Sequence, residues 1–320
     1  MIFFRISAVL LFSLCALDAG AQYPSKPVRI IQPYAAGGGG DIITRIVVQK
    51  VAANTGKPFV VDNRTGAAGR VGYGLVAKSP GDGYTLVVTD TGYNILPALY
   101  GASLPWDSAT DLVPVTQAGN WSFAIVVSPK LNVTSLQGLV DLAKASPGKL
   151  NYGSAGNGSI NHLGAELFKR EANVDITQVP YKGMGEVVTG MLNGSVDVMI
   201  IGTAPVLSYI SAGKMIALAV ASTKRSPVLP NVPSAAEAGY PGVVIENWVG
   251  FSAPKGTPRD IIDWLRNEVA KAIASPDVRE RFTALGVEPS GMSPDEYGAL
   301  MRNDARRWAE LIRATGITAQ

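Results

Sequence analysis

Short runs of β-branched residues alternate with helical patterns along the chain, and this alternation restricts the fold more than any other feature. Val28–Ile31 has the composition of a buried strand, Gly37–Gly40 supplies a turn, and Asp41 is placed to cap the helix that follows. Two further runs, Phe59–Val61 and Tyr84–Val88, continue the pattern. Strands separated by helices predict an α/β fold in which parallel strands are joined by right-handed crossovers.

The alternation begins again after residue 121 and builds a second unit. Strands are predicted at 123–127 and 196–201, and a stretch rich in Pro and Gly at 226–241 ends the unit. A chain that leaves one unit, builds another and returns crosses between them twice, and two crossings form a hinge. The predicted domains are a first lobe of residues 22–122 plus 226–320 and a second lobe of residues 123–225.

Residues 1–21 have the composition of a secretory signal peptide. Arg5 gives a positive start, residues 6–17 form a nearly unbroken apolar run, and Ala19-Gly20-Ala21 has the small-x-small pattern of a cleavage site. We therefore predict cleavage after Ala21 and a periplasmic location. Cys15 lies inside the apolar run, so we expect it to be removed with the peptide and not lipidated.

Composition argues against several classes of function. Lys and Arg number 28 against 25 Asp and Glu, and a net charge of +3 is too slight to predict binding to nucleic acid. The chain has one cysteine and one histidine, which is too few for a site built from Cys or several His ligands. We predict no metal, no cofactor and no catalytic residues, and hence no enzymatic activity.

The first candidate binding loop joins a strand end to a helix start at Pro33–Asp41. Its glycines allow the backbone to approach a ligand, and the N–H groups of a first helical turn favour an anion. The candidate ligand-binding residues here are Tyr34, Gly37, Gly38 and Asp41. The loop matches neither a dinucleotide fingerprint nor a Walker loop, so no nucleotide is predicted. A plain tight turn capped by Asp41 is the alternative interpretation.

A second loop repeats this arrangement in the second unit. Its candidate residues are Ser154, Ala155, Gly156, Gly158, Ser159 and His162. Two such loops that face each other across a cleft would supply N–H groups and hydroxyls from both sides. A hydrolase would pair Ser154 or Ser159 with His162, but the chain has no G-x-S-x-G elbow. Ser159 and His162 are spaced like a helix cap and the residue one turn later, which favours mutual hydrogen bonding.

Polar and small residues follow other predicted strands at the same edge of each sheet. In open α/β sheets, ligands lie beyond the carboxyl ends of the strands. These positions therefore complete the predicted site, and ordinary polar turns are the alternative. The residues concerned are Thr89, Asp90 and Thr91 in the first unit, and Tyr181, Lys182, Gly202 and Thr203 in the second.

Several motifs spread over most of the chain point to one family. They are Tyr23-Pro24-Ser25-Lys26-Pro27, Pro33–Asp41, Val61-Asp62-Asn63-Arg64, Pro80–Leu86, Ser154–His162, Val179–Gly183, Arg225-Ser226-Pro227, Pro230-Asn231-Val232-Pro233 and Ala253–Pro258. From Tyr23 to Gly316 the chain resembles the Bug-type periplasmic solute receptors of tripartite tricarboxylate transporters.

The resemblance implies a two-lobed type II periplasmic-binding-protein fold with a hinge. It also implies a small carboxylated ligand held between the two glycine-rich loops by N–H groups, hydroxyls and bridging water, and transporter membrane subunits as partners. The protein is expected to be a monomer. Two positions depart from the family pattern: Gly202-Thr203 stand where an acidic or amide residue is frequent, and Asp90 stands where a neutral residue is expected. If Asp90 faces the cleft, it would favour an ammonium or hydroxyl group on the ligand.

Three other functions stay open at the level of sequence. The receptor could present its ligand to a sensor, the scaffold could carry an exported hydrolase, or the fold could be the effector domain of a regulator. The signal peptide and the absence of an attached DNA-binding domain count against the regulator. Recognition through the backbone leaves few side chains to encode the solute, so the sequence does not identify the carboxylate.

Overall fold

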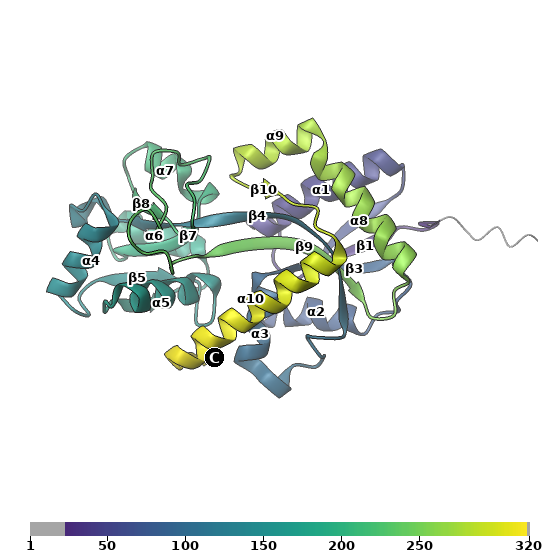
Figure 1. Cartoon of the computed structure of the whole chain (residues 1–320), viewed down its shortest axis with the longest axis horizontal. Helices are drawn as coiled ribbons and strands as arrows, with labels where there is room; N and C mark the ends of the chain where they lie inside the picture. The colour runs from purple at the N-terminus through teal and green to yellow at the C-terminus, as the bar shows by residue number, and fades with distance from the viewer. Residues whose placement is uncertain (1–22, 319–320) are drawn as a thin grey trace, which may run out of the picture.

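The computed structural model describes residues 23–318, so the predicted signal peptide and its cleavage site lie outside the described residues. Two long strands, β4 (Leu112–Val127) and β9 (Glu246–Pro254), run between two α/β lobes (Figure 1). The other strands are β1 (Val28–Gln32), β2 (Phe59–Asn63), β3 (Thr85–Asp90), β5 (Asn151–Ser154), β6 (Thr177–Pro180), β7 (Val198–Gly202), β8 (Ile216–Val220) and β10 (Glu288–Pro289).

The strand order within the described part of the chain is β2-β1-β3-β9-β4-β7-β5-β6, and β8 and β10 also pair with β4. β1 is parallel to β2 and β3, and β5 is parallel to β6 and β7. These parallel pairs match the pairing that the alternating pattern predicts within each unit. β4 and β9 each run from one lobe into the other. They pair antiparallel with each other, and β9 with β3 and β4 with β7 are antiparallel as well.

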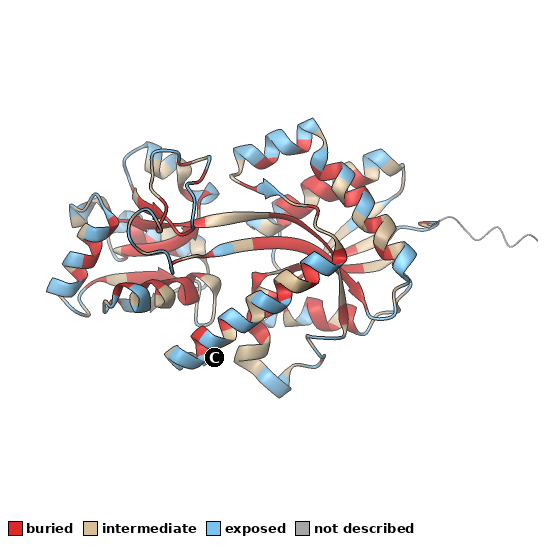
Figure 2. Cartoon of the chain, in the orientation of Figure 1, coloured by how far each residue is buried: buried red, intermediate tan, exposed pale blue. Residues whose placement is uncertain are grey.

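Helices cover both faces of each lobe and bury the strands between them (Figure 2). In the first lobe α1, α8 and α9 pack on one face, and α2, α3 and α10 pack on the other. In the second lobe α4 and α5 lie on one face, and α6 and α7 on the other. The helices are α1 (Gly39–Thr55), α2 (Arg70–Ala77), α3 (Thr91–Tyr100), α4 (Leu136–Ala145), α5 (Ile160–Ala172), α6 (Met184–Asn193), α7 (Leu207–Ser211), α8 (Arg259–Ala274), α9 (Pro276–Ala284) and α10 (Pro294–Thr315).

The chain crosses between the lobes at two adjacent places. Residues 112–122 of β4 pair with β9, and residues 123–127 pair with β7 and β8. The return crossing is the start of β9 at Glu246, where the backbone of Phe123 donates to the carbonyl of Ile245. The two crossings are therefore hydrogen-bonded neighbours, which suits a hinge.

The second crossing corrects the predicted return to the first lobe at residue 226. Ala235, Val243 and Ile245 are fully buried in the core of the second lobe. Ser234 also forms a parallel bridge with Val220 at the end of β8. The stretch at 226–241 is therefore a loop-rich part of the second lobe, because its apolar residues pack in the cores of that lobe.

The structure also places a helix directly after β3. Thr89–Asn94 was predicted to follow the third strand with its hydroxyls open to the cleft, and an ordinary polar turn was the alternative; in the structure β3 runs to Asp90 and α3 begins at Thr91. The Asp90 side chain caps this helix by accepting a hydrogen bond from the N–H of Tyr93. Among residues 23–318, no helix is both long and apolar enough to cross a membrane.

Candidate binding site

The first predicted loop leads from β1 into α1. Gly38 is the N-cap of α1, and its extended backbone makes no side-chain cap. The N–H groups of the first helical turn lack intrahelical acceptors, so they are available to an anion. Gly37 has φ +86°, a conformation that side-chain-bearing residues rarely adopt. Asp41 lies in the first turn of α1 and is not its N-cap, which differs from the sequence interpretation.

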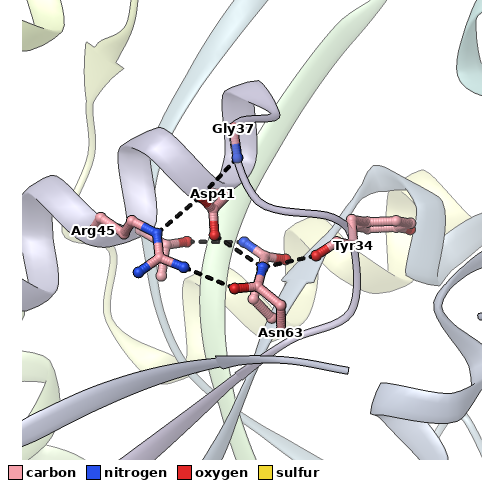
Figure 3. A network of polar contacts seen from close by, with 7 residues as sticks. Tyr34, Gly37, Asp41, Arg45 and Asn63 are labelled. Carbon is pink, nitrogen blue, oxygen red and sulfur yellow. Dashed lines mark hydrogen bonds and ion pairs between the residues drawn. The ribbon is translucent and has the colours of Figure 1, made fainter. Parts of the chain in front are cut away.

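A partly buried polar network around Asp41 holds this loop in place (Figure 3). The carboxylate of Asp41 accepts from the N–H of Gly37 at 3.0 Å, from Nε of Arg45 at 2.9 Å and from Nδ2 of Asn63 at 3.0 Å. Asn63 also donates to the carbonyl of Tyr34 at 2.8 Å and accepts from Arg45 at 2.7 Å. Burial alone would raise the pKa of Asp41, but these hydrogen bonds and the charge of Arg45 lower it. The Asp41 carboxylate is therefore committed to holding the loop.

The second predicted loop leads from β5 into α5 and is held by its own side chains. Ser159 is the N-cap of α5; its Oγ accepts from the N–H of His162 at 3.3 Å and donates to the carbonyl of Gly156 at 2.8 Å. Nδ1 of His162 accepts from the N–H of Gly158 at 3.0 Å. Burial lowers the pKa of His162, which agrees with the neutral ring that this contact requires. Ser159 and His162 thus brace the loop.

The contacts of Ser159 and His162 lie within their own loop. In residues 23–318, no serine hydroxyl is hydrogen-bonded to a ring nitrogen of His162. Oγ of Ser154 is buried and accepts from Gln178 at 2.9 Å. The described part of the chain also contains no cluster of three or more His, Cys, Asp or Glu residues able to hold a metal ion.

A cavity of about 450 Å³ lies between the lobes where the two helix starts meet. Gly39 and Gly40 of α1 line it from the first lobe, and Ile160 and Asn161 of α5 line it from the second. The volume falls in the usual range for small-molecule sites. The other lining residues are Gly37, Ile42, Ile43, Trp121, Phe123, Met184, Ile201, Gly202, Ala204, Pro205, Asn247, Leu285 and Val287.

Two of the predicted site residues line this cavity, and the others lie beside it, behind it or away from it. Gly37 and Gly202 line it, and Gly38 and Ser159 directly precede lining residues. Tyr34, Asp41 and His162 hold the loops from behind through the contacts above. The predicted residues that do not line it are Tyr34, Gly38, Asp41, Thr89, Asp90, Thr91, Ser154, Ala155, Gly156, Gly158, Ser159, His162, Tyr181, Lys182 and Thr203.

Side chains at the end of β3 point into the first lobe. Oγ1 of Thr89 is hydrogen-bonded to Ser252 at 2.9 Å and to Tyr297 at 2.8 Å. Oδ1 of Asp90 accepts from the hydroxyl of Tyr73 at 2.9 Å and from that of Tyr34 at 3.3 Å. Burial raises the pKa of Asp90 to about 6 although hydrogen bonds to its carboxylate oppose this. Asp90 therefore supports the Tyr34 loop and gives no reason to expect an ammonium group on a ligand.

At the strand ends of the second lobe, the predicted residues bring few polar side chains to the cavity. Lys182 is exposed, and Tyr181 packs beside Met184 in the outer core of this lobe. Thr203 is buried, and its Oγ1 has no hydrogen-bond partner within residues 23–318. Gly202 lines the cavity next to the indole of Trp121.

Sequence reasoning missed the residues that form the centre of the cavity. Trp121 and Asn247 lie opposite each other on β4 and β9. Asn161 is buried, and its Nδ2 donates to the carbonyl of Ile200 at 2.6 Å. The signal for Asn161 was present, because it lies one residue before His162 at the start of a predicted helix. Trp121 was treated only as the point where the pattern restarts.

The comparisons with known proteins agree with this architecture. Residues 43–317 match the family model described as the tripartite tricarboxylate transporter family receptor. The chain is 37% identical to the protein BugT of Bordetella pertussis over 300 residues, which cover 92% of this chain and 90% of that protein. The predicted resemblance to Bug-type receptors is thereby confirmed.

Two solved structures from Rhodopseudomonas palustris share the fold. One, determined with adipate, has 33% identity and a TM-score of 0.84, and the match covers 92% of this chain and 99% of that one. The other, MatC with bound malate, has 30% identity and a TM-score of 0.79, with 91% and 100% covered. The predicted two-lobed periplasmic-binding-protein fold is confirmed, and the chain belongs to the tripartite tricarboxylate transporter receptor family.

Proposed function

We propose that the chain is a periplasmic solute receptor that captures one small carboxylate between its lobes and delivers it to a tripartite tricarboxylate-type membrane transporter. One observation carries the proposal: the first turns of α1 and α5 line a single cavity from opposite lobes. Each helix start favours negative charge through its unpaired N–H groups and its dipole. A carboxylate placed between them would receive N–H groups from both sides.

The hinge gives the proposed receptor a means of closing. β4 and β9 connect the lobes, and each supplies a residue, Trp121 and Asn247, to the cavity between them. A ligand that contacts both lobes favours the conformation in which both contacts are made. Adipate and malate in the related structures support a carboxylate as the ligand class.

The proposal includes no catalytic step, because the hydroxyl of Ser159 and Nδ1 of His162 are occupied by contacts within their own loop. The binding residues proposed are the glycine backbone at 37–40 and the start of α5 at 159–161, with His162 and Asp41 as positioning residues. The protein is proposed to act as a monomer after export and cleavage behind Ala21. Intact mass of periplasmic material tests that cleavage, and a mature chain beginning anywhere but Gln22 contradicts it.

A thermal-shift screen with a panel of carboxylates tests the proposed function. A ligand at 100 times its dissociation constant adds about 2.7 kcal/mol to the stability of the folded state, which gives a clear rise in melting temperature. The amides of the same acids serve as matched controls, since they keep the shape and lack the charge. Equal shifts with acids and amides, or no shift with any acid, would refute the carboxylate receptor.

A further inference from the structure

The cavity between the lobes has an unusual balance of side chains for a site that holds an anion. Among its described lining residues, the polar side chains are those of Asn161 and Asn247, and none of the lining side chains is charged. Four lining residues are glycines, and the rest are apolar. Ile42, Ile43, Trp121, Phe123, Ile160, Met184, Ile201, Ala204, Pro205, Leu285 and Val287 make up this apolar wall.

Trp121 is the largest side chain of the wall, and its indole lies between the lobes. A Cβ atom placed on Gly39 of α1 would lie 3.9 Å from Cζ2 of the indole. A Cβ atom placed on Gly202 at the end of β7 would lie 3.1 Å from its Nε1. Gly202 has no side chain, and the indole occupies the space that one would need. Gly202 thus makes room for an aromatic surface inside the cavity, and Gly39 lies within ordinary contact distance of it.

No charged side chain lines the cavity within the described residues. Arg45 binds Asp41 and Asn63 behind the first loop. Lys224 and Arg225 line a second cavity, which shares Trp121 with the first. The helix starts can neutralise one carboxylate, but a second one would be buried against apolar side chains. An ionised carboxylate without a partner in such a place is strongly disfavoured.

We infer that the receptor selects carboxylates with a single charge and an apolar, preferably aromatic, body that packs on Trp121. The inference rests on the proposed function, because it places the carboxylate at the starts of α1 and α5. The body then lies against the apolar wall. Aromatic rings in contact gain stability beyond the burial of their area, so a flat ring is favoured over a saturated one.

Calorimetric titration with four acids tests the selectivity. Benzoate and cyclohexanecarboxylate carry one charge on an apolar ring, whereas adipate and malate carry two charges. Benzoate is expected to bind at least about tenfold more tightly than adipate or malate, a difference of about 1.4 kcal/mol. Equal or tighter binding of adipate or malate would overturn the inference and leave the carboxylate receptor intact. Failure of all four acids to bind would overturn both.

Two substitutions of the tryptophan test the proposed contact. Trp121→Ala should weaken benzoate binding at least about tenfold and leave adipate binding almost unchanged, because only the ring contact is lost. Trp121→Phe keeps an aromatic surface and should stay within about threefold of the wild type for benzoate. A melting curve of each variant establishes that it is folded. If Trp121→Ala weakens both acids equally, the tryptophan does not select the body of the ligand.

A gain of function tests the charge argument, and a melting curve of the variant checks the fold because Leu285 also packs against the core of the first lobe. Leu285 lines the cavity at the C-terminal end of α9, a position where a cation suits the helix dipole. Leu285→Arg should raise the affinity for adipate relative to benzoate by about tenfold, since it supplies the missing partner for a second carboxylate. Thr283→Arg adds the same charge at an exposed position outside the lining and should leave this ratio unchanged. An unchanged ratio in Leu285→Arg would contradict the inference.

Discussion

Asp41→Asn is the substitution that tests most sharply how the first loop is held. In the wild-type protein Oδ2 accepts two donors, the N–H of Gly37 and Nε of Arg45, and Oδ1 accepts Nδ2 of Asn63. An asparagine of the same shape has one oxygen. If the oxygen of the new amide takes the place of Oδ2, the NH₂ group of the same amide faces the NH₂ group of Asn63. Turning the Asn63 amide does not relieve this, because its Nδ2 also donates to Tyr34 and its Oδ1 accepts from Arg45.

At least one partly buried donor is therefore left without an acceptor in the protein, and the ion pair with Arg45 is lost. An unsatisfied buried group costs about 1–3 kcal/mol, and hydrogen bonds to charged groups lie at the upper end of that range. We expect the free energy of unfolding to fall by about 2 kcal/mol at pH 7. The affinity for a carboxylate should fall as well, because the Gly37 loop loses an anchor.

Urea unfolding at pH 7 measures the loss, with Asp263→Asn as the control. Asp263 also pairs with an arginine four residues away, but its side chain is half exposed, so its removal should change stability by less than about 0.5 kcal/mol. The folded-state pKa of Asp41 lies below its usual value of 3.8, so its contribution is present above that value. The difference in the free energy of unfolding between the wild type and Asp41→Asn should therefore disappear as the pH falls below 3.8. Equal losses in both variants would refute the reasoning.

Three further outcomes are expected. Gly38→Val should lower carboxylate affinity at least about tenfold, because a side chain there blocks the approach of the ligand to the backbone. Its melting should stay normal, since a Cβ at this position meets nothing closer than 3.7 Å. Gly158→Val should lose affinity and stability, since φ is +74° and its Cβ would lie 2.5 Å from Leu99. His162→Ala should cost about 1 kcal/mol of binding by calorimetry, because the N–H of Gly158 loses its acceptor. Burial raises the pKa of Asp90 in the folded protein to about 6. The free energy of unfolding should therefore fall by up to about 3 kcal/mol as the pH rises from 4 to 7, because the folded state must then hold an ionised carboxylate in a buried place. Asp90→Asn, whose amide oxygen can accept the bonds now made to Oδ1, should abolish that decline in urea unfolding.

Elements with clear local signals were predicted closely. α5 begins directly after Ser159, which caps it as its spacing from His162 predicts, and Ser293 caps α10 in the same way. The glycine loop before α1 was also recognised, because its residues are consecutive. In each case the physical cause lies within a few residues of sequence.

The errors arose where a structure depends on distant partners. α3 begins with Thr91-Gly92 and contains Pro97, so its pattern does not indicate a helix. Its cap, Asp90, is kept in place by tyrosines from other segments. The first half of β4 was missed because Pro114 and Gly119 interrupt the alternation, and its pairing with β9 compensates for them.

The same distinction explains why the loops of the site could be predicted and its wall could not. Trp121 enters the cavity because β4 crosses between the lobes at that residue, and its partner Asn247 comes from a crossing more than a hundred residues later. Local sequence carries no sign of this pairing. In the proposed receptor, the aromatic residue that contacts the body of the ligand therefore belongs to one of the strands that connect the lobes. A substitution at Trp121 should change the choice of ligand, whereas a substitution in the glycine loops should weaken every carboxylate alike.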